Sequence, residues 1–134
     1  MLTYIDSNIF LYAVLYDDER AQRCRHVLSG IVDGKIEAVT SALTWDEFTH
    51  VVEKVLDRPA AVLQGERFLH FPRLLFQPCT TDVLIRAQQV RTTTSLGARD
   101  SIHAASALIA GTRTLISEDR DFDGIPKLNR RSAG

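Results

Sequence analysis

Short apolar runs alternate along the chain with longer segments in which apolar residues recur at helical spacing. The short runs predict strands at residues 2–5, 36–40, 74–77 and 114–117. The longer segments predict helices over residues 9–16, 18–32, 41–55, 59–70, 81–93 and 98–110. Because strands and helices alternate in order, we expect a mainly parallel sheet with helices on both faces, an α/β fold.

Length and composition indicate one globular domain. The 134 residues fit a single domain over residues 1–134, without repeats or linkers, and we expect 127–134 to be a partly frayed basic tail. The net charge of −1 gives no general reason to bind nucleic acid, so any RNA contact must be local. Two cysteines do not form a disulfide framework or a zinc site. No leader or membrane-length apolar run is present, so we expect a cytoplasmic protein without membrane contact.

Acidic residues fall near the ends of the predicted strands. Asp6 directly follows the first strand, and Asp119 and Asp121 follow the fourth. Asp100 lies in the first turn of the helix leading into the fourth strand, and Glu47 lies in the helix after the second. Ligands of open parallel sheets bind beyond the carboxyl ends of the strands. We therefore expect these acids to converge at one edge of the sheet.

Converging acids without basic partners repel one another, and a divalent cation relieves that repulsion. A donor set made only of carboxylate oxygens suits Mg²⁺ or Mn²⁺. Such a cation lowers the pKa of bound water and stabilises charge during phosphodiester cleavage, so a nearly neutral chain is able to engage RNA through it. The predicted ligands are Asp6, Glu47, Asp100 and one of Asp119 and Asp121.

Each acid also has a purely structural interpretation. Asp6 suits a helix cap, Glu47 has the spacing of a capping box, and Asp100 suits the positive end of a helix. Asp119 and Asp121 suit an ordinary turn. Their joint placement at one edge is what favours the metal site.

Three further residues are candidates for supporting roles. His103 follows Asp100 by three residues on the same helical face, where it orients a ligand, contacts phosphate or is simply a buried histidine. Ser7 and Ser117 hydrogen-bond a water or a carboxylate, or cap helices. We expect Trp45 to lie in the core.

Four motifs resemble those of PIN-domain proteins, in the order found in that family. They are Asp6–Tyr12, Ser41–Phe48, Leu96–Ala105 and Leu115–Phe122, the last followed by Gly124-Ile125-Pro126. The resemblance covers nearly the whole chain. Within the family, the length and motifs are most similar to VapC-type toxins of toxin–antitoxin pairs.

The resemblance implies a three-layer α/β/α PIN-like domain and a metal-dependent endoribonuclease using Mg²⁺ or Mn²⁺. It also implies a homodimer that is silenced by a small antitoxin protein. The family's metal ligands carry over to Asp6, Glu47 and Asp100, and Asp119 is favoured over Asp121 because it follows the strand more directly.

Two other functions compete with this interpretation. A catalytically silent PIN fold that binds RNA or acts as a scaffold would not need the complete set of acids. An aspartyl phosphatase would need a second aspartate two residues after Asp6, where this chain has Asn8. Apolar residues around Ile31, Phe48 or Leu63 are candidates for a surface that binds a second copy or an antitoxin.

Overall fold

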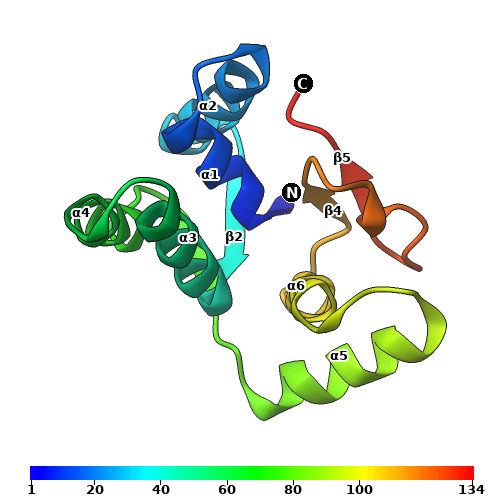
Figure 1. Ribbon diagram of the computed structural model, residues 1–134. Coiled ribbons are helices and arrows are strands. Elements are labelled where there is room, and N and C mark those ends of the chain that lie inside the picture. The colour runs from blue at the N-terminus through cyan, green and yellow to red at the C-terminus, as the bar shows by residue number, and fades with distance from the viewer.

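A five-stranded parallel sheet forms the centre of the computed structural model, which describes residues 1–134 (Figure 1). Its strands are β1 (Leu2–Ile5), β2 (Glu37–Ser41), β3 (Leu74–Gln77), β4 (Thr114–Ile116) and β5 (Asn129–Arg131). They lie in the order β3-β2-β1-β4-β5, and every neighbouring pair is parallel. The expectation of a mainly parallel α/β sheet is confirmed.

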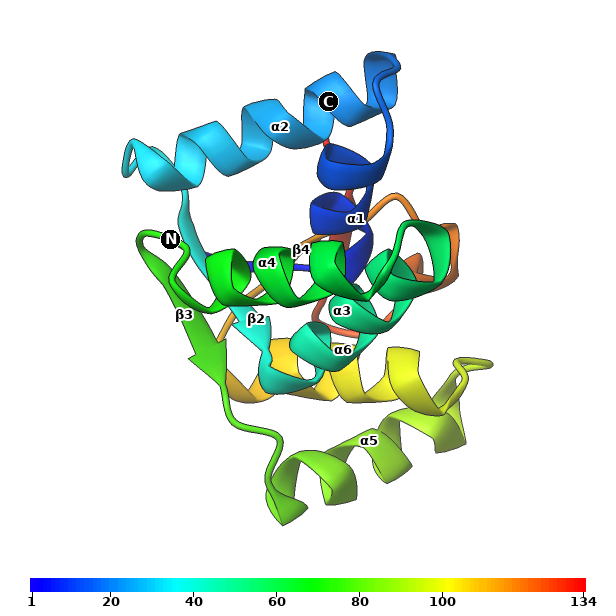
Figure 2. The same ribbon diagram turned by 60° about the vertical axis from the view of Figure 1, so that its left-hand side comes forward.

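Helices cover both faces of this sheet, as Figures 1 and 2 show. They are α1 (Ser7–Leu15), α2 (Glu19–Val32), α3 (Ala42–Val55), α4 (Arg58–Leu69), α5 (Thr81–Thr93) and α6 (Ala98–Ile109), with a 3-10 turn, η1 (Arg120–Phe122). Helices α1 to α4 pack on one face, and α5 and α6 pack on the other. The six predicted helices are all present, so the three-layer α/β/α architecture is confirmed.

Each face of the sheet has its own apolar core, because successive side chains of a strand point to opposite faces. In β1, Ile5 belongs to the core under α1 to α4, whereas Tyr4 belongs to the core under α6. In β2, Ala38 belongs to the core under α1 to α4 and Val39 to the core under α6. Strands β1 and β2 therefore contribute side chains to the cores on both faces of the sheet.

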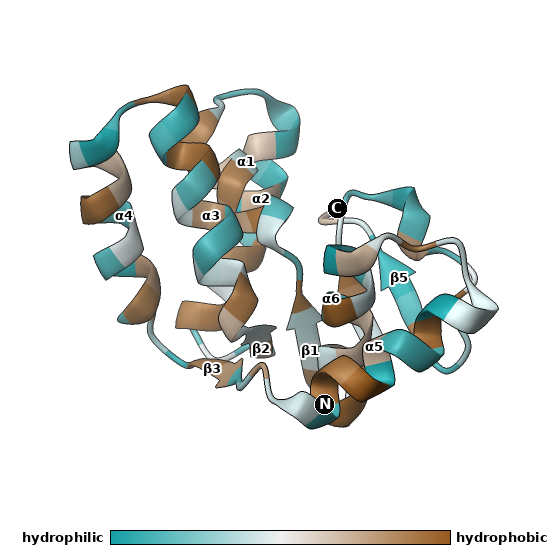
Figure 3. Cartoon of the chain, turned by 60° about the horizontal axis from the view of Figure 1, so that its bottom comes forward, coloured by the Kyte–Doolittle hydropathy of each residue, from teal (hydrophilic) through white to brown (hydrophobic).

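The C-terminal residues correct one expectation, because part of the predicted frayed tail is ordered. Leu128 is buried, and Asn129 to Arg131 pair with Thr114 to Ile116 as the edge strand β5. Figure 3 shows β5 as a hydrophilic strand, in contrast to the apolar β3 at the other edge. An edge strand needs backbone pairing on one side only and tolerates polar side chains, so apolar patterning did not reveal it.

Exposure corrects the expectations for several apolar side chains. Trp45 is 43% exposed on α3 and is not part of the core. Ile31 and Phe48 are buried and offer no docking surface, whereas Leu63 on α4 is exposed. No helix has the length and apolar character that crossing a membrane requires.

Candidate active site

The predicted acids gather at the carboxyl edge of the sheet. Asp6 follows β1, Ser41 is the last residue of β2 and Ser117 follows β4, so three adjacent strands end beside one another. Helices α1 and α3 begin at this edge, with Asp6 and Ser41 as their N-caps. The Asp6 side chain accepts a hydrogen bond from Ser7 N at 2.8 Å, so Asp6 caps a helix and also faces the site.

Asp6 is almost completely buried and is held by neighbouring polar groups. It is 4% exposed, and Ser117 Oγ donates a 2.7 Å hydrogen bond to its Oδ2. Burial raises the pKa of Asp6, although the positive potential of His103 and the Ser117 hydrogen bond oppose that effect. Ser117 also accepts hydrogen bonds from Asn8 Nδ2 at 3.1 Å and Asp119 N at 3.0 Å. Ser117 therefore connects the acids that follow β1 and β4.

Asp100, Asp119 and Asp121 form a compact acidic group. One carboxylate oxygen from each lies within 4.8 Å of the others. Burial, and then the charges of Asp6 and Asp119, raise the pKa of Asp100 to about 6. No lysine or arginine forms an ion pair with any of these three aspartates. Oxygen donors with unbalanced negative charge fit a hard divalent cation such as Mg²⁺ or Mn²⁺.

His103 and Glu47 meet across the site. The His103 ring is completely buried, and its Nε2 contacts Glu47 Oε1 and lies 3.7 Å from Asp6 Oδ1. Burial alone would lower the pKa of His103, but the Glu47 hydrogen bond and the surrounding acids outweigh it and raise that pKa. Glu47 does not complete a capping box, because Ser41 caps α3 and Glu47 points to the histidine instead.

Arg130 of β5 fixes the loop that follows β4. Its Nε donates to Asp123 Oδ1 at 2.6 Å, and its Nη1 donates to the Ser117 carbonyl oxygen at 2.9 Å. Ser117 N in turn donates to the Arg131 carbonyl oxygen at 2.9 Å. The hydrogen bond from Arg130 lowers the pKa of Asp123. These bonds hold the loop that carries Asp119 and Asp121 against the sheet.

The structure brings every predicted site residue to this edge. It adds three residues that the sequence interpretation missed, namely Tyr4, Asn8 and Arg130. Tyr4 carried a usable signal, because a tyrosine in a buried strand requires a hydrogen-bond partner for its hydroxyl. Arg130 carried none, since the strand that places it has no apolar pattern.

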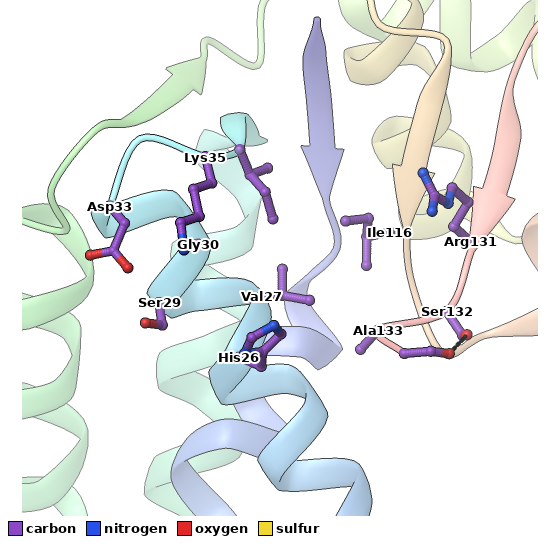
Figure 4. Close-up of a pocket in the computed structure, with 12 residues that line it drawn as sticks. His26, Val27, Ser29, Gly30, Asp33, Lys35, Ile116, Arg131, Ser132 and Ala133 are labelled. Atoms are coloured by element: carbon purple, nitrogen blue, oxygen red, sulfur yellow. Dashed lines mark hydrogen bonds between the residues drawn. The ribbon is translucent and has the colours of Figure 1, made fainter.

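A separate cavity of about 560 Å³ lies between α2 and the C-terminal residues (Figure 4). His26 and Val27 line it from α2, and Ser132 and Ala133 line it from the C-terminal segment. Asp33 is the only acidic side chain among its lining residues, and none of the clustered acids reaches it. The donor set of this cavity does not fit a divalent cation, in contrast to that of the acidic edge.

A family model described as the PIN domain matches residues 3–128. The chain belongs to the PIN domain family. The matched range contains all of the clustered acids, so the PIN domain includes the whole candidate site.

Comparisons with individual proteins agree with this assignment and confirm the resemblance to VapC-type proteins. Ribonuclease VapC7 of Mycobacterium tuberculosis is 29% identical over 119 residues, which cover 88% of this chain and 82% of that protein. The DNA-bound VapBC complex of Salmonella typhimurium contains a chain with a TM-score of 0.77 and 20% identity, and the match covers 100% of each chain. VapC20 of Mycobacterium tuberculosis, described as a sarcin-ricin loop cleaving toxin, has a TM-score of 0.76 and 14% identity, covering 94% of this chain and 98% of that one. The structural matches support the PIN fold.

Proposed function

We propose that this PIN domain is a metal-dependent endoribonuclease that acts as the toxin of a toxin–antitoxin pair. The observation that carries the proposal is the unpaired acidic group at the carboxyl edge, where Asp100 has a pKa of about 6 beside Asp6 and Asp119. So many acids without lysine or arginine partners destabilise the folded chain unless a cation joins them. The ribonuclease name of the VapC7 relative supports RNA as the substrate.

Asp6, Glu47, Asp100 and Asp119 are the proposed ligands of Mg²⁺ or Mn²⁺. The bound cation supplies an activated water and stabilises the charge that develops on the cleaved phosphate. Ser7 and Ser117 hold the Asp6 carboxylate through its two oxygens, and His103 contacts Glu47. These contacts restrict the carboxylates before the cation binds, and such restriction favours a defined coordination geometry.

The likeness to VapBC complexes supports two further proposals about partners. The structural relatives include toxin–antitoxin complexes, so we propose a small antitoxin protein as the regulator of this chain. A homodimer in the cytoplasm is the proposed working form. The PIN match over residues 3–128 is consistent with a single domain spanning residues 1–134.

The fourth ligand is proposed to be Asp119 and not Asp121. Asp119 is half-buried, and its charge acts on Asp100, whereas Asp121 is exposed and is not among the groups that shift Asp100. We expect Asp119→Asn to reduce the cleavage rate more than about 100-fold, above the loss typical of residues that only support a metal ligand. Asp121→Asn should reduce the cleavage rate by less than about 10-fold. Single-turnover cleavage of one RNA by both variants measures the difference, and a reversed order would make Asp121 the ligand.

Removal of divalent cations is expected to abolish RNA cleavage. A mixed RNA pool would be incubated with purified, antitoxin-free protein in Mg²⁺, in Mn²⁺ and in EDTA, with Asp6→Asn as the matched variant. Cleavage should stop in EDTA, return when Mn²⁺ is added back, and be absent from Asp6→Asn under every condition. A folded protein that neither cleaves nor binds Mn²⁺ would instead be a silent PIN scaffold.

A further inference from the structure

A continuous chain of buried hydrogen bonds ends at Glu47. It begins at the backbone N–H of Ser41, which donates to Tyr4 Oη at 3.1 Å. Tyr4 Oη lies 2.6 Å from His103 Nδ1, and His103 Nε2 contacts Glu47 Oε1. Ser41, Tyr4 and His103 are each 0% exposed, whereas the Glu47 side chain is 18% exposed at the site.

The groups at the two ends of the chain determine the direction of its first and last bonds. A backbone N–H only donates, so Tyr4 Oη accepts from Ser41. The Tyr4 hydroxyl has one hydrogen of its own left to donate. When the imidazole is neutral, His103 Nδ1 accepts that hydrogen and the ring hydrogen lies on Nε2, and a protonated ring carries a hydrogen on Nε2 as well. A carboxylate only accepts, so Nε2 donates to Glu47.

This chain joins elements from both faces of the sheet. Glu47 is carried by α3 and His103 by α6, while Tyr4 lies on β1 between the two layers (Figure 3). His103 is three residues after Asp100 on the same helix, so a contact to His103 also fixes Glu47 relative to Asp100. A glutamate has several rotatable bonds, and without a partner its carboxylate would sample many positions.

We propose that Tyr4 and His103 are positioning residues that hold the Glu47 carboxylate where the divalent cation requires it. This inference rests on the proposed function and deepens it. A buried tyrosine–histidine pair is not needed for packing, because apolar residues of similar size fill a core without polar groups to satisfy. Its specific effect is to present a fixed donor to one carboxylate of the site.

The test is Mn²⁺ binding to the whole chain by isothermal titration calorimetry, without RNA. His103→Leu is expected to weaken Mn²⁺ binding by about 10–100-fold, the range found when partners of metal ligands are removed. Tyr4→Phe is expected to weaken it by about 10-fold, because the donor to Nδ1 is lost but the ring remains. His103→Gln keeps an N–H donor near the position of Nε2 and should bind more tightly than His103→Leu.

Two controls separate positioning from general destabilisation. Thr112→Val removes a different buried hydrogen bond, to the Ala107 carbonyl oxygen, and should leave Mn²⁺ affinity at the wild-type value. In a Glu47→Gln background, Tyr4→Phe should have little additional effect, since Tyr4 acts through Glu47. Nitrogen NMR of the His103 ring in the metal-free protein is expected to show a hydrogen on Nε2.

The outcomes distinguish this inference from the proposed function. If the folded Tyr4→Phe and His103→Leu variants bind Mn²⁺ as tightly as wild type, the positioning role is overturned. The nuclease proposal would remain intact. An undiminished effect of Tyr4→Phe in the Glu47→Gln background, or a ring hydrogen on Nδ1 alone, would also overturn it. Wild-type protein that fails to bind Mn²⁺ would overturn the proposed function and this inference together.

Discussion

The Asp100→Asn variant is expected to lose RNA cleavage by more than about 100-fold, a larger loss than removal of a supporting residue causes. In metal-free buffer the same variant is expected to unfold at a higher urea concentration than wild type. Asparagine keeps the shape of the side chain but removes a negative charge that Asp6 and Asp119 repel. Loss of activity together with a gain in stability is the behaviour of a residue placed for function.

The pH dependence of stability tests the same residue. The pKa of Asp100 is raised from 3.8 to about 6 in the folded chain, so folding favours its protonated form. The stability linked to this group is fully present below pH 3.8 and is lost as the pH rises through about 6. In EDTA, the free energy of unfolding of wild type should therefore fall between pH 4.5 and 7.5 more than that of Asp100→Asn.

Urea denaturation at the two pH values measures this difference, and Asp46→Asn is the matched control. Asp46 is exposed on α3 and makes no ion pair, so its substitution should leave the pH dependence and the cleavage rate at wild-type values. Equal pH dependence in wild type and Asp100→Asn would contradict the raised pKa. Retained cleavage in Asp100→Asn would remove Asp100 from the proposed ligands.

The sequence predicted the strands and helices whose apolar residues form a run or recur at helical spacing. Residues 2–5 form a mainly apolar run that ends in the buried Tyr4 and Ile5, and helix α6 is rich in small residues that pack closely on the sheet. The convergence of Asp6, Asp100 and Asp119 also followed from the sequence, because ligand sites of parallel sheets lie at the carboxyl edge. The order of the strands was not predicted from the sequence and comes from the structure.

Features that depend on pairwise contacts did not follow from the sequence. Strand β5 is polar and is held by backbone bonds to β4, so it has no periodic pattern. The contact between Glu47 and His103 joins residues 56 positions apart, and no local spacing indicates it. The capping interpretation of Glu47 had a local pattern in its favour, but the buried histidine offered the carboxylate a better partner.

Phe122→Ala is expected to be the most destabilising substitution near the site. Phe122 is completely buried directly after Asp121, in the core that also contains Tyr4 and Leu115. Removing a buried phenylalanine ring costs about 3–5 kcal/mol. That loss is a large part of the roughly 5–15 kcal/mol that stabilises a typical domain. Urea denaturation measures it, with Leu84→Ala as control, because Leu84 is exposed on α5 and its loss should cost about 0.5 kcal/mol or less.

Added Mn²⁺ separates the global effect of Phe122 from its effect on the site. A cation at 100 times its dissociation constant stabilises an intact site by about 2.7 kcal/mol. Wild type and Leu84→Ala should both gain that amount at the same Mn²⁺ concentration. Phe122→Ala should gain less, because Phe122 anchors the turn Arg120–Phe122 that follows Asp119. An equal gain in all three proteins would mean that Phe122 stabilises the core without positioning the acids, and that the bonds from Arg130 and Ser117 alone hold the loop.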